Sequence, residues 1–283
     1  MDILLPVATY PDVTARTGLD HALTLSARLG ARVTALIQQV DVPPIHSGFG
    51  ELLLDLSAMA AQAEQLSRQS AETTRLWLLE RGASLGLPTV TANIVTCGPE
   101  SFVDRLLPLA RHLDLTAIVL DGSDPQRLVE MEALLFGSGG PVLAVPARSA
   151  MAPIPAVPPV PLRIVIAWDG TRAASRALRD ALPILVGADP VTLVTIGDDK
   201  TMDPAGAASV LALLEHHGIP ARHLARSRGT APIGETLQAI AISQQADLLV
   251  MGAYGHSRLQ QMILGGATSG ILHAPRLPVW LSH

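Results

Sequence analysis

The sequence predicts an α/β protein of two tandem doubly wound domains, each with a five-stranded parallel sheet and helices on both faces. The same order of strand-like and helix-like segments occurs twice along the 283 residues, which indicates a duplication. Apolar runs alternate with helix-period segments, as in parallel sheets. A proline-rich stretch at residues 149–161 is typical of an extended linker. We therefore expect domains at residues 1–148 and 162–283, related by a pseudo-two-fold axis.

In the first copy, the apolar run at residues 2–7 predicts a strand that leads through a turn into a helix-period segment. The later elements keep this alternation. We expect further strands at residues 31–37, 89–95, 116–120 and 141–145, a long helix at 52–80 and a shorter one at 100–111.

The second copy repeats the order with strands expected at residues 163–168, 191–196, 221–225, 247–251 and 278–281. Apolar residues at helical spacing predict a helix near residues 174–185, and another at 233–242. Between them, Asp203 and Pro204 predict the start of a third helix, with a capping carboxylate followed by proline at the first helical position, and Gly218 marks its end.

In parallel sheets of this kind a ligand lies beyond the carboxyl ends of the strands, where the strand order reverses. Any site should follow strands one and four.

Composition argues against several classes of partner. The formal charge is −5 and no stretch gathers Lys or Arg, so we expect no nucleic acid partner. No run approaches the roughly 20 apolar residues of a membrane span. The histidines show no metal-ligand spacing, and we expect no metal site. Cys97 is the single cysteine, which excludes an intrachain disulfide and favours a reducing cytoplasm.

The chemistry-bearing motif follows the fourth strand of the second copy. Gly252-Ala-Tyr-Gly255 is followed nine residues later by Gly265-Gly266-Ala267-Thr268, which opens an expected helix. Glycines let the backbone approach a ligand, and the first amides of a helix attract anions because they lack internal partners. The motif therefore predicts a phosphate-binding loop, with the Thr268 hydroxyl as a further donor.

This arrangement resembles the universal stress protein family, whose nucleotide-binding members carry Gly-x2-Gly-x9-Gly-(Ser/Thr) after the fourth strand. Gly252, Gly255 and Gly265 match in spacing, and the element order of both copies matches as well. The resemblance implies binding of ATP or AMP, with or without Mg²⁺, in the second copy. The residues it implies for that site are Ala167, Trp168, Asp169, Ile196, Met251, Gly252, Gly255, His256, Arg258, Gly265, Gly266, Ala267 and Thr268.

Two departures limit the resemblance. Gly266 stands where the family has Ser or Thr, so one hydroxyl contact to phosphate is missing. In the first copy, Asp121-Gly-Ser-Asp124-Pro125 replaces the glycine motif, its two carboxylates would repel phosphate, and Ala8 or Thr9 stands where the second copy has Asp169. We expect the first copy to be structural or regulatory, without a nucleotide site.

Each candidate residue also has a purely structural interpretation. The glycines can serve turns and close packing, and Asp169 can cap a helix. Arg258 can be a solvated loop charge, and Trp168 is better explained by packing than by stacking on a base.

As a whole, the chain is expected to be a nucleotide-binding stress or signalling protein with little or no turnover, although slow ATP hydrolysis stays open. A scaffold that acts through its surfaces is the alternative. A nucleotidyl-transferring enzyme would need a catalytic lysine or a pyrophosphate signature, and neither is found.

The resemblance also implies pairing of the last strands, so residues 142–145 and 279–281 should join the two copies into a pseudo-dimer within one chain. Such pairing removes exposed sheet edges. Whether two chains pair again is left open by the sequence.

Overall fold

The computed structural model describes residues 1–42, 56–122, 124–148, 161–197, 204–227, 229–254 and 266–283. Each half alternates strands and helices, as the sequence predicts. The first half contains β1 (Asp2–Val7), α1 (Arg16–Arg28), β2 (Arg32–Val40), α2 (Leu56–Ser84), β3 (Val90–Cys97), the 3₁₀ turn η1 (Pro99–Ser101), α3 (Phe102–Ala110), β4 (Leu115–Leu120), α4 (Pro125–Gly137) and β5 (Val142–Pro146). The second half contains β6 (Ile164–Ala167), α5 (Arg172–Leu185), β7 (Val191–Ile196), α6 (Pro204–His216), β8 (Ala221–Arg226), α7 (Ile233–Ser243), β9 (Leu248–Gly252), α9 (Ala267–His273) and β10 (Val279–Ser282).

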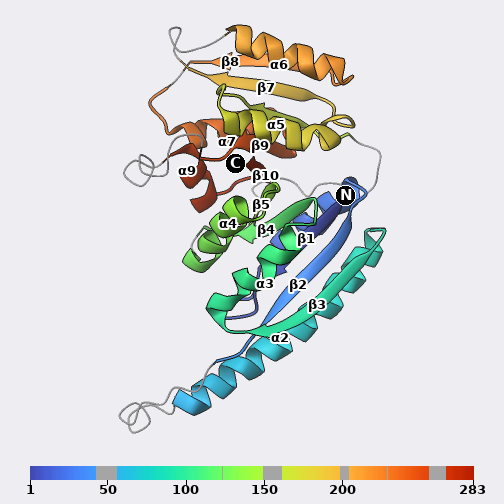
Figure 1. Ribbon diagram of the computed structural model, residues 1–283, viewed down its shortest axis with the longest axis vertical. Helices are drawn as coiled ribbons and strands as arrows, with labels where there is room; N and C mark the ends of the chain where they lie inside the picture. The colour runs from blue at the N-terminus through green and yellow to red at the C-terminus, as the bar shows by residue number, and fades with distance from the viewer. Residues whose placement is uncertain (43–55, 123, 149–160, 198–203, 228, 255–265) are drawn as a thin grey trace.

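The described strands form one ten-stranded sheet in the order β3-β2-β1-β4-β5-β10-β9-β6-β7-β8 (Figure 1). Within each half neighbouring strands are parallel, and the order of the second half is the reverse of the first, as a pseudo-two-fold relation requires. The halves join through β5 and β10, which are antiparallel, with Trp280 opposite Leu143. The predicted α/β fold and the expected pairing of the last strands are therefore confirmed.

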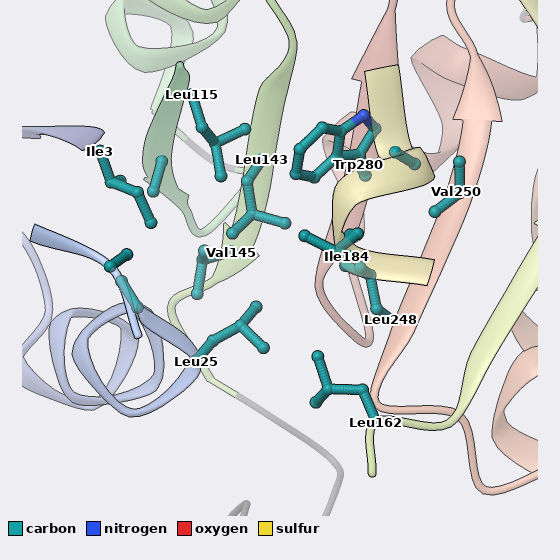
Figure 2. Packing of buried hydrophobic residues seen from close by; sticks show 14 of the residues in the cluster. Ile3, Leu25, Leu115, Leu143, Val145, Leu162, Ile184, Leu248, Val250 and Trp280 are labelled. Carbon is teal, nitrogen blue, oxygen red and sulfur yellow. The ribbon is translucent and has the colours of Figure 1, made fainter. Parts of the chain in front are cut away.

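Helices cover both faces of the sheet, because alternate residues of each strand point to opposite faces. On one face, α1, α2, α5 and α6 pack over a core that runs through both halves. On the other face, α3, α4, α7 and α9 pack over a second continuous core. Figure 2 shows the first core at the junction, where Trp280, which is 1% exposed, lies beside Leu143 and Ile184. The two halves therefore share their cores rather than meeting at a polar surface.

One helix, α4, was absent from the elements that the sequence analysis predicted. Asp124 accepts hydrogen bonds from the amides of Gln126 and Arg127, and Pro125 occupies the first helical position. This is the signal that correctly predicted the start of α6 at Pro204. In the sequence, this segment was considered only for its lack of a Gly-x2-Gly motif, so the helix start at Asp124-Pro125 was not predicted. Residues 149–160 of the expected linker lie outside the described residues, as does Asp203. None of the described helices is long and apolar enough to span a bilayer.

Candidate functional site

In each half, the place where the strand order reverses is called its switch point, between β1 and β4 in the first half and between β6 and β9 in the second. The candidate site lies at the second switch point, beyond the carboxyl ends of β6 and β9. These two strands are neighbours in the sheet, and β7 lies on the other side of β6. Ala167, Trp168 and Asp169 come at the end of β6, and Met251 and Gly252 come at the end of β9. The topology thus brings together the two segments that the sequence predicts to form the site.

The side chains near the candidate site lie on opposite faces of the sheet. Ala167, Ile196, Met251, Tyr254 and Ala267 all belong to or pack against the core under α7 and α9. Trp168 packs against the opposite core, and its amide donates to the Val194 carbonyl at 2.8 Å. Its side chain is half-buried and packs against this core, as the packing interpretation expects.

Burial differs between the two switch points. In the second half Ala167, Ile196 and Gly252, which end β6, β7 and β9, are all half-buried. In the first half Val7 and Leu120, which end β1 and β4, are both fully buried. The strand ends are therefore accessible only at the second switch point among these described residues.

Asp169 has a structural role in this conformation. Its Oδ1 accepts hydrogen bonds from the Thr171 amide at 3.0 Å and from the Thr171 hydroxyl at 2.7 Å. Thr171 in turn is the N-cap of α5 and accepts from the Ala174 amide at 3.2 Å. The Asp169 carboxylate is exposed, so the turn it forms leaves it accessible to solvent and to a ligand.

Gly252 is required by packing, whatever else it does. A Cβ at this position would lie 2.4 Å from the Ala174 nitrogen and 2.5 Å from the Ala173 carbonyl carbon. The end of β9 therefore touches the backbone of the first turn of α5. Close packing against α5 is therefore a sufficient reason for glycine here, apart from the close approach of a ligand that the sequence motif predicts.

The segment at the start of α9 is ordered by a contact with the chain that leaves β9. Gly266 is the N-cap of α9, with φ −62° and ψ 162°, and no side chain caps the first turn. The Tyr254 amide donates to the Thr268 hydroxyl at 3.3 Å, and Thr268 is 5% exposed. Thr268 therefore ties two parts of the motif together, and its hydroxyl keeps one proton to donate. Gly255, His256, Arg258 and Gly265 lie outside the described residues.

The first half of the chain also contributes to this region, which no sequence pattern predicted. Tyr254 contacts Glu132 and Phe136 of α4, more than a hundred residues away in the sequence. Only the tertiary structure brings these residues together, and no local pattern signals the contact.

The first switch point has a different chemistry. Its cavity of about 60 Å³ is lined by Asp12, Asp121 and Asp124 together with Arg127. Binding pockets for small molecules are usually about 300–1,000 Å³, so a nucleotide would not fit this cavity. Arg127 is buried, pairs with Glu130 at 2.6 Å and donates to the Thr14 hydroxyl. A buried ion pair thus lies beside the first switch point.

Among the described residues, no three His, Cys, Asp or Glu side chains are grouped to hold a metal ion.

The chain is similar in sequence and in fold to known proteins. Residues 162–283 match the model of the universal stress protein family. Universal stress protein Slr1230 of Synechocystis is 28% identical over 124 residues, which are 41% of this chain and only 41% of that protein. A universal stress protein structure from Archaeoglobus fulgidus has a TM-score of 0.64 at 15% identity and covers 99% of this chain and 95% of its own. A functionally unknown protein from Pseudomonas aeruginosa has a TM-score of 0.51 at 14% identity, covering 99% and 92%. These two structures share the fold of the whole chain.

Proposed function

Because residues 162–283 match the model of the universal stress protein family, we propose that this half of the chain binds an adenine nucleotide, ATP or AMP. We propose further that it does so in a cytoplasmic stress-response or signalling role. The observation that supports this most is the contrast between the two switch points. The second has accessible strand ends of small or apolar residues, whereas the first has buried ends and a buried ion pair beside them. The half-buried Ala167 and Ile196 offer an apolar surface to a base, and the uncapped amides at the start of α9 suit phosphate.

We propose that this protein binds the nucleotide and does not act as an enzyme. The sequence contains a single lysine, Lys200, which lies in neither of the two segments of the site. Phosphoryl-transfer sites commonly use a lysine to neutralise the transferring group, and the glycine-rich motif contains none. We therefore propose little or no turnover, with Mg²⁺ bound only as part of the nucleotide complex.

Asp169 provides the first test, because its ligand role and its turn role can be separated. Calorimetric titration with ATP, AMP and cyclic AMP in the presence of Mg²⁺ should show one site per wild-type chain. Asp169→Ala should weaken binding by at least about tenfold, since a hydrogen bond to a charged group contributes about 1.5–3 kcal/mol.

Thr171→Ala is the matched control. It removes the hydroxyl hydrogen bond to Asp169 and the α5 cap but keeps the hydrogen bond from the backbone amide at position 171, so the free energy of unfolding should fall by about 0.5–2 kcal/mol. Its nucleotide affinity should stay within about twofold of wild type if Asp169 binds the ligand. Equal loss of affinity in both variants would assign Asp169 to the turn alone.

Gly266 provides a gain-of-function test. Its φ and ψ suit any L-residue, so serine can replace it without backbone strain. Gly266→Ser supplies the hydroxyl that the family carries, and affinity should rise about two- to tenfold, because one hydrogen bond contributes about 0.5–1.5 kcal/mol. Gly266→Ala adds the Cβ without the hydroxyl and should leave the affinity unchanged. A titration in which alanine and serine behave alike would remove the phosphate contact from the proposal.

A scaffold that acts through its surfaces is the second candidate. It is favoured by a specific observation, because Asp169, Gly252 and Thr268 all have structural partners in the described residues. Absence of binding heat and of any thermal shift up to millimolar nucleotide would leave this candidate ahead.

A further inference from the structure

The chain that leaves β9 is held by the other half of the molecule. The Tyr254 hydroxyl donates to Glu132 Oε1 at 2.6 Å, and the Tyr254 ring lies 5.2 Å from the Phe136 ring. Glu132 and Phe136 both lie on α4 of the first half, which Figure 1 shows below α9. The first half thus contacts the residue that begins the path from β9 towards α9.

The backbone of this segment is fixed from two further sides. The Ala253 amide donates to the Ser282 carbonyl at 2.8 Å, and His283 Nδ1 lies 3.1 Å from the Ala253 carbonyl oxygen. His283 also packs edge-on against Phe136 at 4.7 Å. On the other side, the Tyr254 amide donates to Thr268 at the start of α9. The same residue therefore connects the first half with the helix start proposed to bind phosphate.

Tyr254 needs such support because its backbone is left-handed, with φ 51°. For residues other than glycine this region is disfavoured by about 1–2 kcal/mol, a factor of about 5–30 in population. Surrounding contacts must maintain it. The side-chain contacts to α4 and the hydrogen bond from the Tyr254 amide to the Thr268 hydroxyl are among the contacts that do so.

We propose that α4 of the first half is a positioning element for the nucleotide site of the second half, acting through Glu132, Phe136 and the left-handed backbone of Tyr254. This inference rests on the proposed nucleotide-binding function. It gives the first half, whose own switch point has no room for a nucleotide, a role in setting the affinity of its neighbour. Glu132 and Phe136 act at a distance, through Tyr254, and do not touch the ligand.

The test compares nucleotide affinity with the local order of Tyr254 in the full chain. Glu132→Ala and Phe136→Ala should each weaken ATP binding by about fivefold or more, because binding requires a conformation that is then less populated. Hydrogen exchange of the Tyr254 amide should accelerate in the same variants. Glu132→Gln retains an oxygen that accepts from the tyrosine hydroxyl and should restore affinity. Val129→Ala, at an exposed position of α4, should change neither quantity.

Substitution of Tyr254 itself separates positioning from simple packing. Tyr254→Ala keeps the cost of the left-handed backbone and loses the contacts to α4, whereas Tyr254→Gly loses both. The glycine variant should therefore bind ATP more tightly than the alanine variant, although both lose the same ring. A contact that serves stability alone would lower the melting temperature of both variants and leave their affinities equal.

The outcomes distinguish this inference from the function on which it rests. Wild-type affinity in Glu132→Ala and Phe136→Ala, with wild type binding ATP, overturns the positioning role and leaves the proposed function intact. A wild-type chain that binds no nucleotide overturns both. Faster exchange at Tyr254 together with weaker binding, restored by Glu132→Gln, supports the inference.

Discussion

Glu130→Ala is expected to lower the free energy of unfolding by about 3–5 kcal/mol, because it leaves the buried Arg127 guanidinium without its charged partner. Arg127 Nη1 and Glu130 Oε2 are 2.6 Å apart, and the side chains are 6% and 2% exposed. Arg127 also donates to Thr14, which in turn accepts from the Ala8 amide beyond β1. Loss of Glu130 therefore affects the turn after the first strand as well. Urea denaturation followed by circular dichroism measures the change.

Two controls define what this result means. Arg127→Met with Glu130→Leu removes both charges and keeps apolar volume, so it should recover most of the loss of the single variant. Glu72→Ala removes one partner of the exposed pair with Arg75 on α2 and should change the unfolding free energy little. A single variant Glu130→Ala as stable as Glu72→Ala would mean that water reaches Arg127, and the first switch point would then be less closed than its geometry indicates.

Much of the fold could be predicted from the sequence because buried parallel strands have a strong local signature. Residues 2–7 and 191–196, predicted as strands, are β1 and β7 with the same bounds. Other boundaries differ by a few residues, since the last turn of a helix and the last residue of a strand depend on tertiary contacts. α4 was not predicted although Asp124-Pro125 marks its start, because attention to that segment went to its lack of a Gly-x2-Gly motif. The linker at residues 149–161 stays a prediction.

The candidate site was less predictable than the fold, because one residue type can serve several purposes. A turn carboxylate such as Asp169 has the same sequence context whether or not it contacts a ligand. No sequence pattern indicated the contribution of Glu132 and Phe136, since it depends on how β5 and β10 join the halves.

The structure favours an inert role for Cys97. Its side chain is 6% exposed, and burial raises the pKa of its thiol, which disfavours the reactive thiolate.

Gly252→Ala is expected to destabilise the chain by about 1–3 kcal/mol, and Gly252→Val by more, because the added atoms overlap backbone rather than side chain. The α5 backbone at Ala173 and Ala174 would have to move away from the sheet. Thermal and urea unfolding measure the loss. Gly187→Ala is the matched control, since a Cβ at that position meets no atom within 4 Å. Its stability should equal or slightly exceed that of wild type.

The first half contains the same close approach with the glycine on the other partner. Val119 pairs with the fourth residue of β5, as Gly252 pairs with the fourth residue of β10. Here Gly18 of α1 is the glycine, and a Cβ on it would lie 2.3 Å from Val119 Cγ1, a side-chain atom. Helix and strand therefore meet closely in both halves, which explains Gly252 without a ligand.

This difference between backbone and side-chain overlap predicts different responses to a second substitution. Gly18→Ala should be partly rescued by Val119→Ala, because trimming that side chain removes the overlapping atom. Gly252→Ala should not be rescued by Ala173→Gly, because the overlap with the Ala174 nitrogen and the Ala173 carbonyl carbon persists. Rescue in the second pair would show that α5 can shift. Packing alone would then not require a glycine at position 252, which leaves the close approach of a ligand as the reason for it.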